Sequence, residues 1–135
     1  MPIFWQVPKN PQVKLSRRER QILDILYQRE KASASDVREA MEDPPSYSAV
    51  RTLLGVLEEK GHIQHEADGL KYVYSPTVPK EKAWRSVMKH MMDTYFGGSP
   101  EQAVAALLDV SSGQLKREDL NRMAAMIEKA KKEGK

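Results

Sequence analysis

Residues 46–75, SYSAVRTLLGVLEEKGHIQHEADGLKYVYS, place a helical pattern directly before two strand-like segments. The helical part opens at Ser46, a good N-cap, and ends at Gly61, a residue able to take the left-handed conformation. Apolar side chains recur along it with the spacing of an amphipathic helix: Val50, Leu53, Leu54 and Leu57. Alternating residues on either side of Gly69 then predict a β-hairpin over 62–75.

Two shorter helices are expected before this segment. Ser16 and Glu19 form an S-x-x-E capping box, which starts a helix that fades near Lys31. Ser33 is the expected cap of the second helix, and the Pro44-Pro45 pair stops it. Three helices followed by a hairpin predict a winged helix-turn-helix domain over residues 15–77, in which the third helix can enter the DNA major groove.

The second half of the chain is expected to be entirely helical. Its apolar pattern and turn residues predict helices over 80–96, 100–109 and 115–132, the second one opening at Ser99. We therefore expect a fold that is mainly α with a small β-hairpin. The expected division is an N-terminal arm at 1–14, the winged helix at 15–77 and a helical region at 78–135.

Composition excludes several kinds of chemistry. Cysteine is absent, so disulfides, thiolate metal sites and cysteine nucleophiles are ruled out. His62 and His65 fall on opposite faces of a predicted strand, and His90 is remote in the sequence. The sequence pattern places no general base and no oxyanion-stabilising group beside any candidate nucleophile. We expect no metal, no cofactor and no enzymatic activity.

The charge and hydropathy of the chain suggest where it acts. No apolar run approaches the roughly 20 residues that a membrane-spanning helix needs, and the first residues lack a signal-peptide pattern. We therefore expect a cytoplasmic protein without direct membrane insertion. The net charge of +3 argues only weakly for an acidic partner. Basic side chains concentrate between Lys9 and Arg20, whereas acidic and basic residues balance over 1–77 as a whole.

Several of these segments, in this order, resemble one bacterial family. They are LSRRERQILDILY, ASASDVREAM, SYSAVRTLLGVLEEKG, YVYSP and MMDTYFGGSPEQAVAALL. Over residues 14–130 the chain is similar to the penicillinase-repressor (BlaI/MecI) family of transcriptional repressors. The resemblance implies a homodimer whose winged helices bind the half-sites of an inverted-repeat operator in double-stranded DNA.

The resemblance also implies that the C-terminal helices pair with those of a second copy. The apolar side chains of these helices exceed what three short helices could bury in isolation, which agrees with that implication. The alternative is that they pack back onto their own domain. The candidates for a shared dimerisation core are Trp84, Met88, Met91, Met92, Leu107, Leu108, Leu120, Met123 and Ile127.

DNA contacts are expected from the start of the third helix and from basic residues around it. Five side chains can reach base edges: Ser46, Tyr47, Ser48, Arg51 and Thr52. Four cations are candidates for phosphate contacts: Arg17, Arg18, Lys60 and Lys71. Arg51 suits a bidentate contact to guanine. It could instead clamp a phosphate or pair with Glu39 or Glu58.

Two positions of the third helix depart from the family pattern. Ala49 stands where threonine is usual, and Gly55 stands where a basic residue is common. Glycine inside a helix costs about 1 kcal/mol relative to alanine. Close approach to DNA and close packing against another element are the two reasons we consider for Gly55.

Inactivation in the best-known relatives uses a membrane sensor-protease that responds to a β-lactam, followed by cleavage of an Asn-Phe bond in the dimerisation region. The matching segment here, 104–108, contains neither asparagine nor phenylalanine. Cleavage between Ala106 and Leu107, with a sensor-protease as partner, is therefore a hypothesis. Copper-responsive relatives use a cysteine cluster that this chain lacks.

The sequence also allows a second interpretation, in which the chain belongs to a different functional class. Winged helices also serve as protein-interaction modules without sequence-specific DNA binding. Ala49, Gly55 and the neutral first half favour this alternative. A common basic surface formed by Arg17, Arg18, Arg51 and Lys71 would favour DNA binding, and an apolar or acidic surface there would favour a protein partner.

Overall fold

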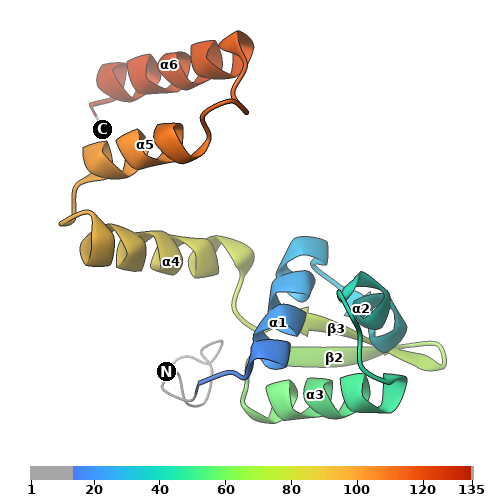
Figure 1. The fold of residues 1–135 in the computed structure, drawn as a ribbon. Helices are drawn as coiled ribbons and strands as arrows, with labels where there is room; N and C mark the ends of the chain where they lie inside the picture. Colours follow the sequence, from blue (N-terminus) through green and yellow to red (C-terminus); the bar gives the residue numbers. More distant parts are fainter. Residues whose placement is uncertain (1–13, 135) are drawn as a thin grey trace. The chain divides into compact units, whose positions relative to one another are not determined.

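The computed structural model describes residues 14–134 and divides the chain into two units, the first ending at Ser86 and the second beginning at Val87 (Figure 1). The predicted arm at 1–14 lies outside the described residues except for Lys14. The division that we expected near residue 77 remains a prediction.

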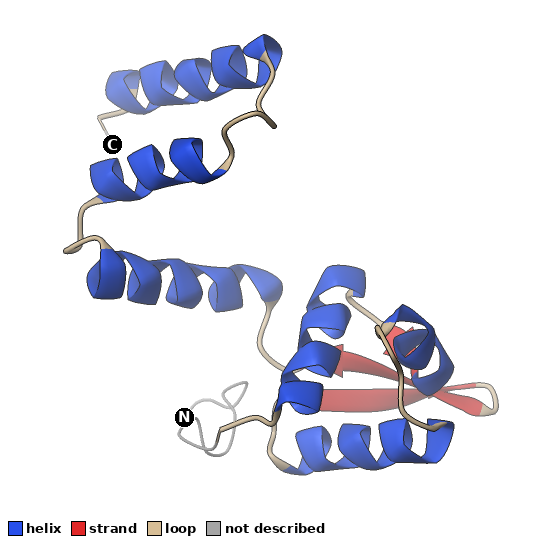
Figure 2. Cartoon of the chain, viewed as in Figure 1, coloured by secondary structure: helices blue, strands red, loops and turns tan. Residues whose placement is uncertain are grey.

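The first unit contains the expected three helices and hairpin. Its elements are α1 (Arg17–Arg29), β1 (Ala32–Ser33), α2 (Ala34–Ala40), α3 (Tyr47–Glu59), β2 (Ile63–Asp68) and β3 (Lys71–Pro76), shown by type in Figure 2. The hydroxyls of Ser16, Ser33 and Ser46 each accept a hydrogen bond from the backbone N–H of the residue three positions later. All three predicted helix starts are therefore confirmed. The mainly α fold with a β-hairpin is confirmed as well.

The sheet contains a strand that the sequence pattern did not predict. The strand order is β1-β3-β2 and both pairings are antiparallel. Ala32 pairs with Tyr74, and Ser33 pairs with Val73, which ties the segment between α1 and α2 to the inner strand of the hairpin. Asp68 pairs with Lys71, leaving a two-residue turn in which Gly69 has a φ of +67°. Positive φ at the first central residue is what a type II′ turn requires.

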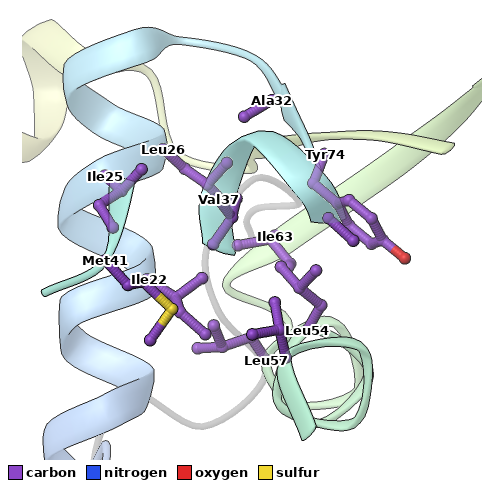
Figure 3. Packing of buried hydrophobic residues seen from close by; sticks show 12 residues of the cluster. Ile22, Ile25, Leu26, Ala32, Val37, Met41, Leu54, Leu57, Ile63 and Tyr74 are labelled. Atoms are coloured by element: carbon purple, nitrogen blue, oxygen red, sulfur yellow. The ribbon is translucent and has the colours of Figure 1, made fainter. Parts of the chain in front are cut away.

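The core of this unit forms where the three helices meet the base of the sheet (Figure 3). Side chains from α1, α2 and α3 close over Ile63 of β2 and Tyr74 of β3. The fully buried members are Ile22, Leu26, Val37, Val50, Leu54, Leu57 and Ile63. Burial of such side chains provides most of the stabilising free energy of a small domain. The outer face of α3 and the tip of the hairpin remain exposed.

The second unit is built from helices alone. α4 (Lys80–Tyr95) begins in the first unit and continues into the second, followed by α5 (Pro100–Val110) and α6 (Arg117–Lys132). The Ser99 hydroxyl accepts the Gln102 N–H, as its predicted cap role requires. No residue of α4, α5 or α6 is buried. Over residues 14–134, no helix is long and apolar enough to cross a bilayer.

Candidate nucleic-acid interface

The first two turns of α3 present the five side chains that were predicted to reach base edges. Ser46 caps the helix, and the side chains of Tyr47, Ser48, Arg51 and Thr52 are exposed along its outer face. Thr52 donates its hydroxyl to the Ser48 carbonyl at 3.1 Å. Its hydroxyl proton is therefore already used, which leaves its oxygen as an acceptor. The helix places donors, acceptors and an aromatic ring side by side.

A groove of about 450 Å³ separates this helix from the wing. The start of α2, the first turns of α3 and the strand β3 form its walls, and both Arg51 and Lys71 line it. Arg51 makes no hydrogen bond or ion pair with any residue in the described range 14–134. Its guanidinium is therefore available to an external acceptor. Pairing with Glu39 or Glu58, the alternative considered from the sequence, does not occur.

Glu58 instead bonds to the wing. Nδ1 of His65 on β2 lies 2.6 Å from Oε2 of Glu58 on α3. A carboxylate only accepts hydrogen bonds, so the proton of this bond belongs to Nδ1. The His65 ring also stacks on Tyr72 with 4.3 Å between centroids. These contacts join α3 to the wing on one side of the sheet and orient the groove between them.

The four phosphate candidates fall into two groups. Arg18 donates to the Asp43 carbonyl at 2.7 Å and to the Glu42 carbonyl at 3.4 Å, which ties the loop after α2 to α1. Lys60 donates to Glu19 at 2.7 Å. The cations of Arg18 and Lys60 are therefore engaged within the domain. Arg17 and Lys71 are exposed and remain the better candidates for phosphate.

The structure does not gather the basic residues into one groove. Arg51 and Lys71 line the groove beside α3, whereas Arg17 and Arg18 line a second depression together with Asp24 and Glu42. Asp36 adds a negative charge to the first groove. The Ser33 N–H donates to its carboxylate at 3.2 Å and lowers the pKa of Asp36. Positive potential is thus concentrated at Arg51 and Lys71 rather than spread evenly.

Leu70 at the tip of the wing was not among the predicted site residues. Its side chain is 108% exposed, and it lines the same groove as Arg51. The signal in the sequence is an apolar residue directly after the turn glycine Gly69, where a polar residue is usual. The wing therefore presents an apolar tip beside the cation of Lys71.

Three capped helices, a hairpin wing and an exposed third helix with a free guanidinium define a winged-helix domain of the class used by transcriptional regulators. The family model described as penicillinase repressor matches residues 15–129. The chain belongs to this family of DNA-binding transcriptional repressors, and it is not an enzyme. The resemblance seen in the sequence is confirmed.

Individual relatives are distant. The chain is 24% identical over 98 residues to an uncharacterized 16.5 kDa protein from the ptsI 3' region of Latilactobacillus sakei, covering 71% of this chain and 67% of the relative. Among solved structures, M. tuberculosis Rv0081 is 21% identical with a TM-score of 0.49, covering 61% of this chain and 80% of that one. A mutant of Lactococcus lactis ZitR is 16% identical with a TM-score of 0.48, covering 96% and 84%.

Proposed function

We propose that the chain acts in the cytoplasm as a homodimeric repressor that binds an inverted-repeat operator through α3. The observation that carries this proposal is the free Arg51 guanidinium on the exposed face of a capped helix, beside the wing. A two-fold dimer presents two copies of α3, so its half-sites face the same side of the duplex.

Base readout is assigned to the first two turns of α3. Arg51 donates in bidentate fashion to a guanine, a contact worth about 1–3 kcal/mol of discrimination. Tyr47 packs on a thymine methyl or on the backbone at the groove entrance. The hydroxyls of Ser46, Ser48 and Thr52 complete the set of groups that can meet base edges.

Phosphate contacts are assigned first to Arg17 and Lys71, whose cations are exposed. Arg18 and Lys60 support the interface by holding the loop after α2 and the end of α3 in position. The backbone N–H groups at the start of the helices add further donors for phosphate oxygens. Neutralised phosphates release counterions, so operator affinity falls as salt concentration rises.

Dimerisation is assigned to the helical half. Each of the nine predicted core residues is partly or fully exposed in the single chain, which is unusual for side chains of this kind. A second copy covers them in the proposed dimer. These residues are Trp84, Met88, Met91, Met92, Leu107, Leu108, Leu120, Met123 and Ile127.

The proposed switch is proteolysis within α5. The Ala106-Leu107 bond lies inside α5, so a protease must first open the helix. No residue of α5 is buried in the single chain, so in the proposed dimer the free energy cost of opening this helix is set mainly by releasing Leu107 and Leu108 from the shared core. A membrane sensor-protease is the proposed partner. An intact protein in host cells treated with a β-lactam would refute this switch without affecting operator binding.

The decisive experiment is selection of bound duplexes from a random DNA pool, followed by affinity measurements at two salt concentrations. The proposal expects recovery of an inverted repeat that the protein binds more weakly at high salt and that the Arg51→Ala variant no longer binds. This result would establish sequence-specific operator binding. A pool that remains random while the protein is folded and dimeric would refute it. That outcome would favour a winged-helix module that binds another protein.

A further inference from the structure

Residues 76–79, with the sequence PTVP, lead from the wing into α4, and we call them the connector. The connector contains two prolines and no glycine. Proline fixes its own φ near about −65° and restricts the residue before it to extended conformations. Pro76 and Pro79 therefore restrict the backbone of every connector residue except Thr77.

Thr77 is held by hydrogen bonds instead. Its N–H donates to the His62 carbonyl at 3.1 Å, and its hydroxyl donates to the Gly61 carbonyl at 2.8 Å. Both acceptors belong to the turn that follows α3, the helix to which base readout is assigned. Thr77 thus ties the connector to the end of α3.

Tyr27 holds the connector from the side of α1. Its hydroxyl donates to the Val78 carbonyl at 3.2 Å, although the two residues are 51 positions apart in the chain. A hollow of about 300 Å³ beside this bond is lined by Leu26, Tyr27, Val78 and Pro79. Close packing alone therefore does not immobilise the connector here. The hydrogen bond from Tyr27 is the specific contact that holds it.

α4 begins directly after the connector. The Pro79 carbonyl accepts the Ala83 N–H at 2.9 Å, as in the first turn of a helix. The segment from Lys80 to Tyr95 contains neither glycine nor proline, and the first unit extends to Ser86 within this helix. The first turns of α4 therefore belong with the winged helix and do not form a loose tether.

In the proposed dimer, the connector and α4 are the covalent link between each winged helix and the helices that pair. Both copies of α3 must reach their half-sites at the same time. Each base pair added between the half-sites moves one of them by about 3.4 Å and turns it by about a tenth of a helical turn. A freely moving link would accept several spacings, whereas a fixed link favours one spacing through preorganisation.

We propose that Tyr27 and Thr77 are specificity-determining residues for the spacing of the operator half-sites, because their hydrogen bonds fix the connector to the winged helix. This role rests on the proposed function, the binding of a dimer to an inverted repeat. Neither side chain contacts DNA in this role. Loss of the two hydroxyls changes which spacing the dimer accepts and leaves the bases that α3 reads unchanged.

The test uses Tyr27→Phe and Thr77→Val, each of which removes one hydroxyl with little change in volume. Thr77→Ser keeps the hydroxyl and is the rescue variant. Tyr95→Phe is the control, because the exposed Tyr95 hydroxyl on α4 makes no hydrogen bond within residues 14–134. Binding of the full chain is measured to the selected operator, to the same duplex with one base pair inserted or removed between the half-sites, and to a single half-site.

The wild-type chain should prefer the selected spacing over the altered spacings by at least about 10-fold. Tyr27→Phe and Thr77→Val should each lower this preference by at least about 3-fold, without changing affinity for the single half-site. The Thr77→Ser and Tyr95→Phe variants should keep the wild-type preference.

Four results would overturn the inference. Equal affinity of the wild-type chain for all three spacings would show that the connector is not fixed. A wild-type preference in both hydroxyl-deletion variants would show that these bonds do not control spacing. Loss of folding, or of single half-site binding, in both variants would show that the bonds only stabilise the winged helix. Absence of binding by the wild-type chain to any duplex would instead refute the proposed function, and with it the basis of this role.

Discussion

The ammonium of Lys60, just after α3, lies 2.7 Å from the carboxylate of Glu19 in the first turn of α1. The same Glu19 oxygen accepts the Ser16 N–H at 3.0 Å, so one carboxylate serves both the helix cap and the ion pair. The side chain of Glu19 is buried, with the residue only 7% exposed. This contact holds the end of α3 against the start of α1.

Glu19→Gln should lower the free energy of unfolding at neutral pH by about 1–3 kcal/mol, because it removes a charge from a largely buried hydrogen-bonded pair. The hydrogen bond from Lys60 is the main cause that lowers the pKa of Glu19 below 4.5. Its stabilising contribution is therefore complete above pH 4.5 and is lost as pH falls through the folded-state pKa. Denaturant unfolding at several pH values should show wild type and variant converging in acid. Parallel curves would contradict this account.

His62 should give the domain a second pH dependence. Burial lowers the pKa of His62 below 6.5, and the nearby Lys60 adds to this. Its buried Nε2 has no hydrogen-bond partner within residues 14–134. As pH falls, His62 is protonated in the unfolded chain at a higher pH than in the folded chain. The free energy of unfolding therefore decreases as pH drops below 6.5 toward the folded-state pKa.

His62→Leu should remove this slope and make the domain more stable than wild type in mild acid. Unfolding free energies between pH 7 and pH 5 would measure it. His90→Gln, at an exposed position of α4, is the matched control and should keep the slope. A slope that survives His62→Leu would show that another group is responsible.

Arg51→Ala should weaken operator binding by about 1–3 kcal/mol and relax the base preference at one position of each half-site. Stability should not change, since Arg51 has no hydrogen bond or ion pair inside the described part of the chain.

Lys71→Ala should weaken binding to all sequences and reduce the slope of log affinity against log salt concentration by about 1. If Arg51→Ala, like Lys71→Ala, weakened binding to every duplex by the same factor, Arg51 would contact a phosphate and not a base.

Leu107→Glu should weaken the proposed dimer. Leu107 is exposed on α5, and a carboxylate buried in a shared core without a partner costs several kcal/mol. Sedimentation at a range of concentrations should show monomer where wild type is dimeric. Gln102→Glu, on the exposed first turn of the same helix, is the control and should leave the assembly intact. A dimer that tolerates Leu107→Glu would place the interface elsewhere.

Local signals in the sequence were sufficient for the helices but not for the complete sheet. Each serine cap is a short-range pattern, and the structure confirms Ser16, Ser33 and Ser46 as N-caps. β1 has only two residues, too few for an alternating pattern. Ser33 also serves as the cap of α2, which hides its second role. Its pairing with Val73 depends on the folded domain and leaves no trace in the neighbouring residues.

The candidate site shows the same limit. Sequence reasoning selected the exposed stripe of α3 from helical periodicity, and the structure places Tyr47, Ser48, Arg51 and Thr52 on that exposed face. Sequence reasoning could not distinguish cations that are engaged in contacts within the domain from cations that are free. Arg18 bonds to the Asp43 carbonyl and Lys60 to Glu19, and both partners lie more than 20 residues away in the chain. Whether a charge is free is a property of tertiary structure.

The pairing of β1 with β3 determines how this wing can change. Because β3 completes a sheet that includes the segment between α1 and α2, deleting the hairpin would remove Ile63 and Tyr74 from the core and leave Ala32 unpaired. The wing is therefore not a detachable appendage. Insertions can accumulate at Gly69 and Leu70, beyond the last paired residues, without loss of the fold. Related repressors can thus diverge in the length of this tip while the base of the hairpin stays constant.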